Sequence, residues 1–575
     1  MRILQQHLDF IEYEPIGKEI KSAEEIPDKS KKRYEEIVAI FVSVEQGDDS
    51  AVAKQAVDGI KAFLEKLKVK RIIIYPYAHL SSNLAKPPEA LEVLKTMEAL
   101  AKEAGLETYR SPFGWNKAFT IKVKGHPLAE QSRFYSNQPQ PARAAAAPAV
   151  VTDRRQASGA EMNEEQLLAR VKKSDFGDLP ETDHRIIGER LDLFSFQEPS
   201  PGMVFWHDKG LRIRNLLVGL SRKEEADRGY IEISTPSITN VVLWKVSGHW
   251  QHYKDNLFLT KIGEEEASLK PMNCPATMLF YRTRRWSYRD LPLRVACFDS
   301  LYRNELSGVA TGLFRVKMFS QDDGHIFATE DQIAEEVSKM IEFMTRIYGI
   351  FGLEFSMNIS TMPDDHLGSV ELWQRATDSL VQALKSRGLE YNVKEKDGAF
   401  YGPKIDVDVK DSMGRKWQCG TIQLDYQMPA RFKLTYASAG GAEQVPVVIH
   451  RAIYGSLERF MGILIEHYQG RFPLWLAPVQ VKVLTVSDDA QSYARDVAKR
   501  LKEEGIRVEE DVETGTIGAK IRNAQLQKIP YMLTLGGKER DAGTLAVRTR
   551  DGQVKYGVKL DDLIHDLKSS TSQYA

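Results

Sequence analysis

The sequence predicts a multidomain protein that combines α/β and α+β folds, and three observations lead to this prediction. Strand and helix patterns alternate over residues 1–137 and again over 476–575, as in small α/β domains. Residues 162–475 mix helices with strands of period-two alternation, which indicates an antiparallel sheet. Between residues 1–137 and this central region, residues 138–161 are rich in proline and alanine and contain no aromatic residue, as expected of a flexible linker.

Composition limits the class of protein. A chain of 575 residues is long enough for about three or four domains. Lys and Arg total 79 against 80 Asp and Glu, so contact with nucleic acid must come from local basic patches. Only three cysteines occur, the first residues lack signal-peptide features, and no run reaches the roughly 20 apolar residues of a membrane span. These features favour a cytoplasmic protein without membrane contact.

The N-terminal region contains two residues that could carry chemistry. Its predicted elements are a first strand, helices over 51–68 and 88–103, and strands over 71–75 and 118–123. His79 follows a buried strand, and Lys117 follows an aromatic and glycine pair. A lone histidine or lysine is, by itself, more often a surface residue than a catalyst.

Residues 269–327 carry the densest set of chemically capable side chains. The segments YRNE and LFRVKMFSQ alternate with period two around the turn-forming LSGVATG, which predicts a β-hairpin. Arginine forks for phosphate and a ring for a base would make its face a floor for a nucleotide. The alternative is a solvated face on which the charges form ion pairs. The residues predicted to share this face of one antiparallel sheet are Arg303, Glu305, Arg315, Phe319, Gln321 and Asp323.

The remaining patterns complete the predicted order of elements. A helix over 210–227 should precede a strand that ends at Pro236. The apolar strand PVVIH ends at His450 and leads into RAIYGSLERFMGILIEHY, which predicts an amphipathic helix with Arg459 on an inner turn. After Pro478, strands alternate with helices over 489–504 and 517–528, which predicts a compact module of about 100 residues.

Several of these motifs together resemble a known family. GYIEISTP, the predicted hairpin and GSLERF resemble motifs 1, 2 and 3 of class II aminoacyl-tRNA synthetases. KPMNCP, RNE-SG, QDD-HIF, FYGPKID, WQCGTIQLDY and HRA-YGSLERF, in this order, are similar to threonyl-tRNA synthetases. YAHLSSNLA, FGW-KAF and KGHPLAE resemble the N-terminal editing domain of the archaeal type, which is related to D-aminoacyl-tRNA deacylases. The C-terminal module resembles the anticodon-binding domain of class IIa enzymes.

The resemblance implies a threonine–tRNA ligase that activates L-threonine with ATP and Mg²⁺ as an adenylate and transfers it to tRNA(Thr). It also implies a homodimer built on motif 1. His249 would help to deprotonate the tRNA hydroxyl, and the alternative for it is a surface histidine beside Trp250. The implied roles are catalysis for Arg303, Lys404, Arg459 and His249; ATP binding for Arg303, Glu305, Arg315, Phe319, Gln418, Ser456 and Arg459; threonine binding for Gln321, Asp323, Tyr401 and Gln423; and anticodon binding for Glu539 and Arg548.

The resemblance further implies one zinc ion per subunit, held by Cys274, His325 and His450, each at the end of an element of one sheet. Their spacing matches no local zinc motif and by itself favours a buried cysteine and hydrogen-bonded histidines. Three ligands leave zinc open to the substrate, so that it can bind threonine through its amino and hydroxyl groups together. Valine lacks the hydroxyl group and cannot bind in this way. Serine carries both groups, and one methyl group discriminates by only about 1–3 kcal/mol, so a second, hydrolytic site is expected.

The N-terminal region is the expected place of that hydrolytic site, which would remove serine from mischarged seryl-tRNA(Thr). The resemblance implies His79, Lys117 and Glu130 as its residues, whereas Gln5, Gln6 and Asn116 depart from the family pattern. The C-terminal module argues against the first of two other functions, and the presence of Arg303, Arg459 and the metal triad argues against the second. The first is a paralogue that adenylates an amino acid without charging tRNA, and the second is a non-catalytic RNA-binding protein of the same fold.

Overall fold

The computed structural model of this chain describes residues 1–135 and 179–574, apart from 21, 68, 82, 125–128, 306–311 and 412–413. The chain divides into two compact units, Met1–Ala149 and Val150–Ala575. The predicted linker over 138–161 and both of its predicted boundaries lie outside the described residues. No helix within the described ranges is both long enough and apolar enough to cross a membrane.

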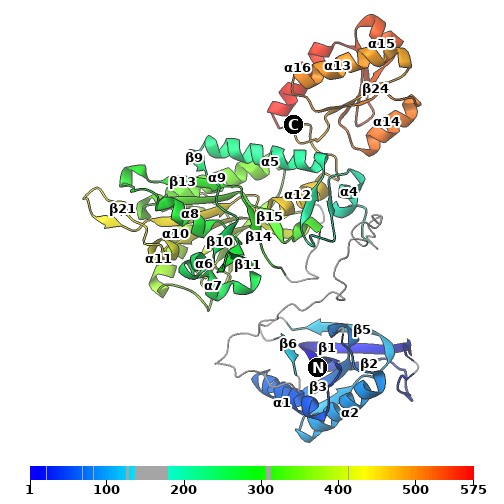
Figure 1. The fold of residues 1–575 in the computed structure, drawn as a ribbon, viewed down its shortest axis with the longest axis vertical. Helices are drawn as coiled ribbons and strands as arrows, with labels where there is room; N and C mark the ends of the chain where they lie inside the picture. The colour runs from blue at the N-terminus through cyan, green and yellow to red at the C-terminus, as the bar shows by residue number, and fades with distance from the viewer. Residues whose placement is uncertain are drawn as a thin grey trace. The chain divides into compact units, whose positions relative to one another are not determined.

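The N-terminal unit is a six-stranded sheet in the order β4-β3-β2-β1-β5, with β6 also paired to β1 and two helices on one face (Figure 1). Ile40 and Ile72 pack against the helices, whereas Phe41 and Tyr75 pack on the opposite face, as period-two alternation requires. The predicted helices and strands are present, with bounds shifted by three residues or fewer. The elements are β1 (Arg2–Lys18), β2 (Lys32–Ser43), α1 (Ser50–Leu67), β3 (Arg71–Pro76), η1 (Ala78–Leu80), α2 (Pro87–Glu103), β4 (Glu107–Arg110), β5 (Trp115–Val123) and β6 (Glu130–Phe134).

The central part is built on an eight-stranded sheet in the order β18-β17-β19-β20-β23-β16-β13-β9. Neighbouring strands are antiparallel except at the two edges, where β17 with β18 and β9 with β13 are parallel. The predicted antiparallel sheet is therefore present as the middle of a mixed sheet. Its strands are β9 (Tyr230–Glu232), β13 (Leu293–Cys297), β16 (Asp323–Ala328), β17 (Phe355–Ser360), β18 (Tyr391–Lys394), β19 (Lys404–Lys410), β20 (Lys416–Asp425) and β23 (Val447–Ala452).

Helices and short strands surround this sheet. The helices are α4 (His184–Arg190), α5 (Asp208–Ala226), α6 (Val242–Ser247), α7 (His249–His252), η2 (Lys254–Asn256), α8 (Cys274–Tyr281), η3 (Tyr288–Asp290), η4 (Gly312–Phe314), η5 (Glu330–Gln332), α9 (Ile333–Phe351), α10 (Val370–Ser386), α11 (Gln427–Arg431) and α12 (Leu457–His467). The short strands are β7 (Phe194–Phe196), β8 (Val204–Trp206), β10 (Ile238–Asn240), β11 (Leu259–Ile262), β12 (Glu265–Leu269), β14 (Ser300–Tyr302), β15 (Met318–Ser320), β21 (Tyr436–Ala437) and β22 (Glu443–Gln444).

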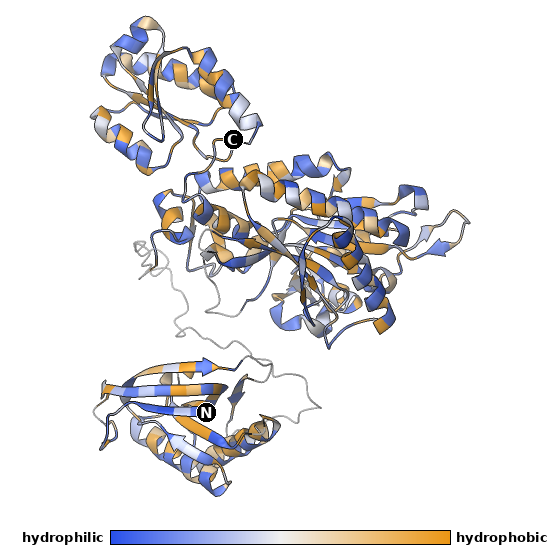
Figure 2. Ribbon diagram, turned by 180° about the vertical axis from the view of Figure 1, so that it is seen from behind, coloured by the Kyte–Doolittle hydropathy of each residue, from blue (hydrophilic) through white to orange (hydrophobic). Residues whose placement is uncertain are grey.

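Side-chain alternation gives the two faces of the large sheet different roles. Ile326, Ile405 and Ile449 join the main core, together with apolar side chains of α9 and α12. Figure 2 shows the matching pattern on the helices, where hydrophobic and hydrophilic residues alternate along each ribbon. The intervening residues, such as His325 and His450, lie on the opposite face, where Phe327 and Val448 pack in a second apolar cluster beside them.

The predicted hairpin is present but shorter than expected. β14 pairs antiparallel with β15, and Leu301 lies opposite Phe319. Arg303 and Arg315 lie outside these strands, and Asp323 belongs to β16 of the large sheet. The prediction that all six odd-numbered residues share one sheet face is therefore wrong. Its period-two pattern is interrupted because the chain leaves the small sheet after β15 and enters the large one.

The predicted helix after His450 begins later than expected. β23 continues to Ala452, and a turn with Gly455 at φ +68° separates it from α12. Ser456 caps the helix, because its Oγ accepts a hydrogen bond from the Arg459 N–H. Arg459 therefore lies in the first turn of α12 and not on an inner turn.

The C-terminal module is a five-stranded sheet in the order β25-β24-β26-β27-β28. The predicted helices correspond to α13 and α14, whereas the sequence patterns do not predict α15, which is too short for a periodic signal, or α16. The elements are β24 (Val481–Thr485), η6 (Asp488–Ala490), α13 (Gln491–Glu503), β25 (Val508–Asp511), α14 (Ile517–Leu526), β26 (Tyr531–Leu535), α15 (Gly537–Ala542), β27 (Leu545–Thr549), β28 (Val554–Val558) and α16 (Leu560–Ser572).

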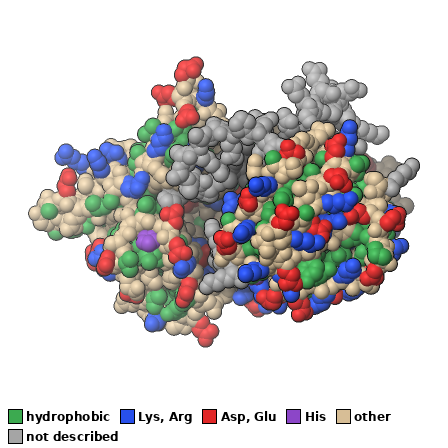
Figure 3. Space-filling view, turned by 90° about the horizontal axis from the view of Figure 1, so that it is seen from below, with side chains coloured by type: hydrophobic (Ala, Val, Ile, Leu, Met, Phe, Trp, Pro, Cys, Tyr) green, Lys and Arg blue, Asp and Glu red, His purple; other side chains and the backbone are tan. Residues whose placement is uncertain are grey.

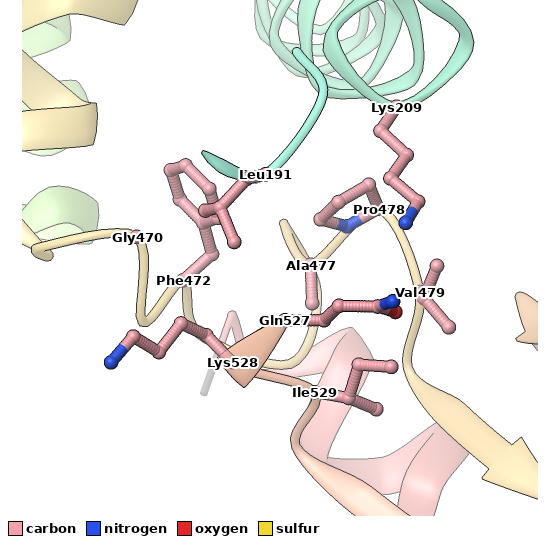
Figure 4. A pocket seen from close by; sticks show the side chains of 10 residues that line it. All are labelled: Leu191, Lys209, Gly470, Phe472, Ala477, Pro478, Val479, Gln527, Lys528 and Ile529. Carbon is pink, nitrogen blue, oxygen red and sulfur yellow. The ribbon is translucent and has the colours of Figure 1, made fainter. Parts of the chain in front are cut away.

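The C-terminal module is joined to the central part by hydrogen bonds from a side chain to backbone carbonyls. The Arg507 guanidinium donates to the carbonyls of Ala477 at 2.8 Å and Trp475 at 2.7 Å. A cavity of about 20 Å³ lies at this junction, between Lys209 and Gln527 (Figure 4), and it has room for about one water molecule.

On the face drawn in Figure 3, Lys and Arg side chains are interspersed with Asp and Glu, in line with their nearly equal totals.

Candidate metal and nucleotide site

Four chemically capable side chains form one row across four neighbouring strands. Lys404 of β19 pairs with Gln423 of β20, and Gln423 pairs with His450 of β23. His450 in turn pairs with His325 of β16. Directly paired residues of adjacent strands project from the same face, with Cβ atoms about 4.5–5.5 Å apart. The register of the sheet thus places an ammonium, an amide and two imidazoles side by side.

Cys274 completes a cluster with the two histidines. Its Sγ and one nitrogen from each ring lie within 4.8 Å of one another, and all three residues are buried. Cys274 is the first residue of α8 and does not belong to the sheet, whereas His325 and His450 lie inside strands. The prediction that each ligand ends an element of one sheet is therefore wrong. A helix N-terminus placed over the sheet face assembles the cluster instead.

The histidines fit a metal ion better than a hydrogen-bonded core. His325 is fully buried, and within the described ranges neither ring nitrogen has a hydrogen-bond partner; an oxygen of Asp323 lies 4.0 Å from Nε2. His450 Nε2 lies 2.9 Å from Asp425 Oδ2, while Nδ1 has no partner among the described residues. A carboxylate that orients a ligand histidine is a common feature of zinc sites.

Burial sets the protonation states of this cluster. Burial, aided by the neighbouring His450, lowers the pKa of His325 well below its ordinary value, so the ring is neutral and can bind a cation. Burial beside Asp323 and Asp425 raises the pKa of the Cys274 thiol well above its ordinary value, so a cation must compensate a thiolate there. One cysteine and two histidines fit Zn²⁺ with one open position.

Three of the four predicted threonine-binding residues surround the cluster. Tyr401 donates a hydrogen bond to Gln423 Oε1, and its ring centroid lies 5.4 Å from that of His450. Asp323 accepts from Asn273 Nδ2 at 3.1 Å, and burial raises its pKa to about 6. Gln321 lies further along, where it forms a bridge with Ser456 at the start of α12.

The predicted adenine and phosphate residues lie around the small hairpin. The Arg303 guanidinium lies over the ring of Phe319, 4.9 Å from its centroid. Phe319 is only 7% exposed and packs on Leu301, so little of its ring is free for a base. Glu305 and Arg315 form an ion pair at 2.7 Å. This pairing is what the alternative interpretation, a solvated sheet face with ion-paired charges, predicts.

Arg459 brings a third guanidinium to the same neighbourhood. Its Nε and Nη1 donate to the carbonyls of Phe314 and Gln418, each at 3.0 Å. Burial lowers the pKa of Arg459, and the positive charges of Arg315 and Arg303 lower it further. Three guanidinium groups that repel one another are a suitable environment for phosphates, which accept paired N–H donors.

Two buried carboxylates that the sequence reasoning missed organise this face. Asp406 is fully buried and accepts from Lys404 Nζ at 2.8 Å and from Gln418 Nε2 at 2.6 Å. Asp425 is the partner of His450. Each carboxylate follows a predicted site residue of its own strand by two positions, so period-two alternation was the signal that could have found them.

His249 is a buried residue and not a surface histidine. It is 1% exposed, and its Nδ1 lies 2.7 Å from Ser247 Oγ. Its ring meets that of Phe400 edge-on, with centroids 5.3 Å apart. Phe400 immediately precedes Tyr401, so His249 lies beside the segment that lines the metal cluster.

The N-terminal unit has a cavity of about 290 Å³ that Lys117 lines together with Ser43 and Tyr77. Lys117 Nζ donates to the Pro112 carbonyl at 2.8 Å and lies 4.8 Å from the ring centroid of Tyr75. Burial lowers the pKa of Lys117 to about 8. The cavity is therefore lined by a lysine that releases its proton unusually easily.

The other predicted hydrolytic residues differ in position. His79 belongs to η1, the segment that directly follows Tyr77 of the cavity wall. Glu130 lies on β6 opposite Gln6, which donates to it at 2.8 Å, whereas Lys117 lies opposite Pro15. Nine residues of β1 separate these positions, about 30 Å of strand. The structure does not bring Glu130 to the cavity, because β5 and β6 pair with opposite ends of β1. Of the residues that depart from the family pattern, Gln5 is fully buried and Asn116 is exposed.

The two predicted anticodon residues belong to the C-terminal sheet and the helix beside it. Glu539 lies in α15, where its carboxylate accepts the Gly536 N–H at 3.0 Å. Arg548 lies in β27, between Met532 of β26 and Val554 of β28. Glu539 thus has a structural role as a helix cap, whatever else it binds.

Comparisons with known proteins agree with this architecture. Residues 1–134 match the archaea-specific editing domain of threonyl-tRNA synthetase, and residues 480–570 match an anticodon-binding domain. Residues 258–468, which contain the whole row from His325 to His450, match the core domain of class II tRNA synthetases for G, H, P, S and T. Fold and site therefore define a class II aminoacyl-tRNA synthetase.

Individual relatives narrow this class. Threonine–tRNA ligases of Desulfatibacillum aliphaticivorans and Clostridium botulinum are each 51% identical, over 66% and 67% of this chain and 60% and 61% of their own length. A crystal structure of the RNA binding domain of threonyl-tRNA synthetase from Cryptosporidium parvum is 43% identical with a TM-score of 0.66, over 68% of this chain and 98% of that one. The chain belongs to the threonyl-tRNA synthetase family, in the form with an archaea-specific N-terminal editing domain. It spans about 60% of the length of the curated relatives that it matches.

Proposed function

We propose that this protein is a threonine–tRNA ligase that activates L-threonine with ATP and transfers it to tRNA(Thr). The observation that carries the proposal is the cross-strand row of Lys404, Gln423, His450 and His325, with Cys274 close to the two histidines. The row joins a cationic end suited to phosphate with a metal-ligating end suited to an amino acid. The sequence relatives support the same reaction.

Positioned cations would carry the adenylation step, in which negative charge gathers around the α-phosphorus as pyrophosphate leaves. Arg303 would bridge the threonine carboxylate and the α-phosphate, and Lys404 would neutralise the other side of that phosphate. Arg315 and Arg459 would hold the distal phosphates of ATP, which brings its own Mg²⁺. The proposed contacts of the adenosine part are Glu305, Phe319, Gln418 and Ser456.

Cys274, His325 and His450 would hold one Zn²⁺, which would act as a Lewis acid toward the amino and hydroxyl groups of threonine. Asp323, buried beside this cluster, would accept hydrogen bonds from the same polar groups, and Tyr401 would close the pocket over the side chain. Gln423 would orient Tyr401 through their hydrogen bond. Gln321, near Ser456, would line the side that faces the nucleotide.

The later steps involve other parts of the chain. His249 would help to take the proton from the tRNA hydroxyl, and its contact with Phe400 would keep it beside the amino-acid pocket. The C-terminal module would bind the anticodon, with Glu539 and Arg548 as contacts. A cytoplasmic homodimer formed through α5 and β9 completes the proposal.

The N-terminal cavity would hydrolyse seryl-tRNA(Thr), with Lys117 and His79 as its residues. A lysine whose pKa is about 8 can take a proton from the water that attacks the ester, or give one to the leaving oxygen, near neutral pH. The separation of Glu130 from the cavity gives it no place in this proposal. A hydrolytic site is needed because zinc chemistry accepts the amino and hydroxyl groups of serine as well as those of threonine.

ATP–pyrophosphate exchange, measured beside tRNA charging, tests the proposal. We expect exchange with threonine, weaker exchange with serine and almost none with valine. Cys274→Ser should lose both the metal and the exchange, while circular dichroism stays unchanged because the sheet keeps its separate apolar core. Exchange without charging would instead support an adenylating paralogue, and neither activity would support an RNA-binding protein of this fold.

A further inference from the structure

A buried histidine outside the row connects α12 with the turn η4, which lies between the two strands of the hairpin. His184 is the first residue of α4 and is fully buried. Its Nδ1 lies 2.8 Å from Glu466 Oε1, and its Nε2 lies 3.0 Å from the Leu313 nitrogen. Because a backbone N–H can only donate, Nε2 must be the unprotonated nitrogen that accepts from Leu313. Nδ1 then carries the proton and donates a hydrogen bond to Glu466. A single neutral tautomer therefore satisfies both neighbours.

The turn η4 fits closely against this ring. Gly312 has φ +56°, and a Cβ atom built there would lie 2.3 Å from His184 Nε2. The ring of Phe314 lies against His184, with centroids 4.3 Å apart. On its other side Phe314 stacks on Trp417, at 4.2 Å and 17°. The turn is thus fixed between an imidazole and an indole.

The η4 turn also fixes the position of Arg459, a proposed ATP-binding residue. The carbonyl of Phe314 accepts a 3.0 Å hydrogen bond from Arg459 Nε. Leu313 and Phe314 are neighbours, so the hydrogen bond that holds the Leu313 N–H also sets the position of the Phe314 carbonyl. Displacement of this carbonyl would release one of the two backbone acceptors that aim the Arg459 guanidinium.

We infer that His184 is a positioning residue for nucleotide binding, which acts through Leu313 and Phe314 on Arg459. The inference rests on the proposed function, because it assigns to Arg459 the distal phosphates of ATP. It predicts an effect on ATP and none on threonine, whose pocket lies at the other end of the row.

A metal ion is the competing explanation for this cluster, because Asp183, His184 and Glu466 offer three ligand atoms near one another. Their atoms already have other partners, however. Asp183 accepts from Arg185, and Glu466 accepts from the Arg415 guanidinium as well as from His184. Cationic partners on both carboxylates oppose a second cation.

Two substitutions of His184 separate its two hydrogen bonds. His184→Gln keeps an acceptor near the position of Nε2, whereas His184→Asn keeps a donor near Nδ1 and leaves the Leu313 N–H without its acceptor. We expect His184→Asn to weaken binding of the non-hydrolysable analogue α,β-methylene-ATP, measured by calorimetry, by about tenfold, the usual effect of one lost hydrogen bond. His184→Gln should stay within about twofold of the unchanged protein.

The kinetic readout is the KM for ATP against the KM for threonine in the exchange assay. His184→Asn should raise only the first, and Gly312→Ala should do the same, because its Cβ would push the imidazole away. The matched control is His207→Asn, since His207 also makes two side-chain hydrogen bonds, to Asp192 and Ser195. It should leave both KM values unchanged.

Several outcomes would overturn the inference. Unchanged analogue affinity in His184→Asn, or equal changes in both KM values, would show that His184 has only a structural role. A metal ion that remains bound in Cys274→Ser and is lost with His184→Asn would replace the inference with a metal site. If the unchanged protein binds the analogue but shows no exchange, the proposed function fails, and the analogue affinities still decide about His184.

Discussion

Replacement of the two cluster histidines by leucine should change the stability of the metal-free protein in opposite directions. His325 is fully buried and, among the described residues, makes no hydrogen bond through either nitrogen. Burial of a polar group without a partner costs about 1–3 kcal/mol. Leucine has a similar size and no polar atom, so His325→Leu should raise the local free energy of unfolding by about 1–3 kcal/mol when a chelator is present.

His450→Leu should have the opposite effect. His450 Nε2 is a partner of Asp425 Oδ2, and Asp425 is fully buried. The backbone donors of Gln427 and Met428 reach the other oxygen, Oδ1. Loss of the imidazole therefore leaves Oδ2 of a buried carboxylate without this partner, which should lower the free energy of unfolding by about 1–3 kcal/mol.

Hydrogen exchange of the strands that carry the histidines measures this local free energy without assuming two-state unfolding of a multidomain chain. Peptides that cover β16 and β23 should be compared in EDTA and at a zinc concentration of about 100 Kd. At that concentration zinc should stabilise the unchanged protein by about 2.7 kcal/mol. It should not stabilise either variant, because each lacks one of the three ligands. The reasoning fails if His325→Leu is less stable than the unchanged protein in EDTA, or if zinc stabilises all three proteins equally.

Four further predictions concern the other parts of the chain. The pKa of Lys117 falls from 10.5 to about 8 on burial, so between these values the unfolded state binds more protons and the N-terminal unit gains stability as the pH rises; Lys117→Met should remove this gain in thermal unfolding followed from pH 8 to 10.5. Lys117→Ala should let seryl-tRNA(Thr) accumulate without slower threonine activation, and an unchanged serine level would contradict its role. Arg303→Ala should slow exchange by several orders of magnitude, and Arg303→Lys should restore little of it, since one ammonium cannot replace a bidentate fork. Near-normal exchange would leave Arg303 only its structural contacts with Pro271 and Phe319. Cleavage near Ala146 should yield a C-terminal piece that charges tRNA with serine as well as threonine, and an N-terminal piece that hydrolyses only the serine ester; hydrolysis no faster than in buffer would rule out the second activity.

The sequence by itself determined the elements whose signal is local. Alternation and breaker residues located both α-helices and three of the six strands of the N-terminal unit, and most of the C-terminal module, because period and turn chemistry depend on neighbours in the chain. The motif residues also identified the family before any geometry was known. The same local signal failed at the start of α12, where β23 continues past His450, and at the hairpin, where the chain changes sheets within a few residues.

Only the tertiary structure decided which residues meet. Cys274, His325 and His450 are far apart in sequence, and it is the antiparallel register of β16 with β23, together with the N-terminus of α8, that brings their ligand atoms within 4.8 Å. The opposite outcome holds for Glu130, which the pairing of β6 with β1 keeps away from Lys117. Register is a long-range property: it depends on which strands pair and on how each sheet face packs, and neither quantity is contained in the periodicity of a single segment.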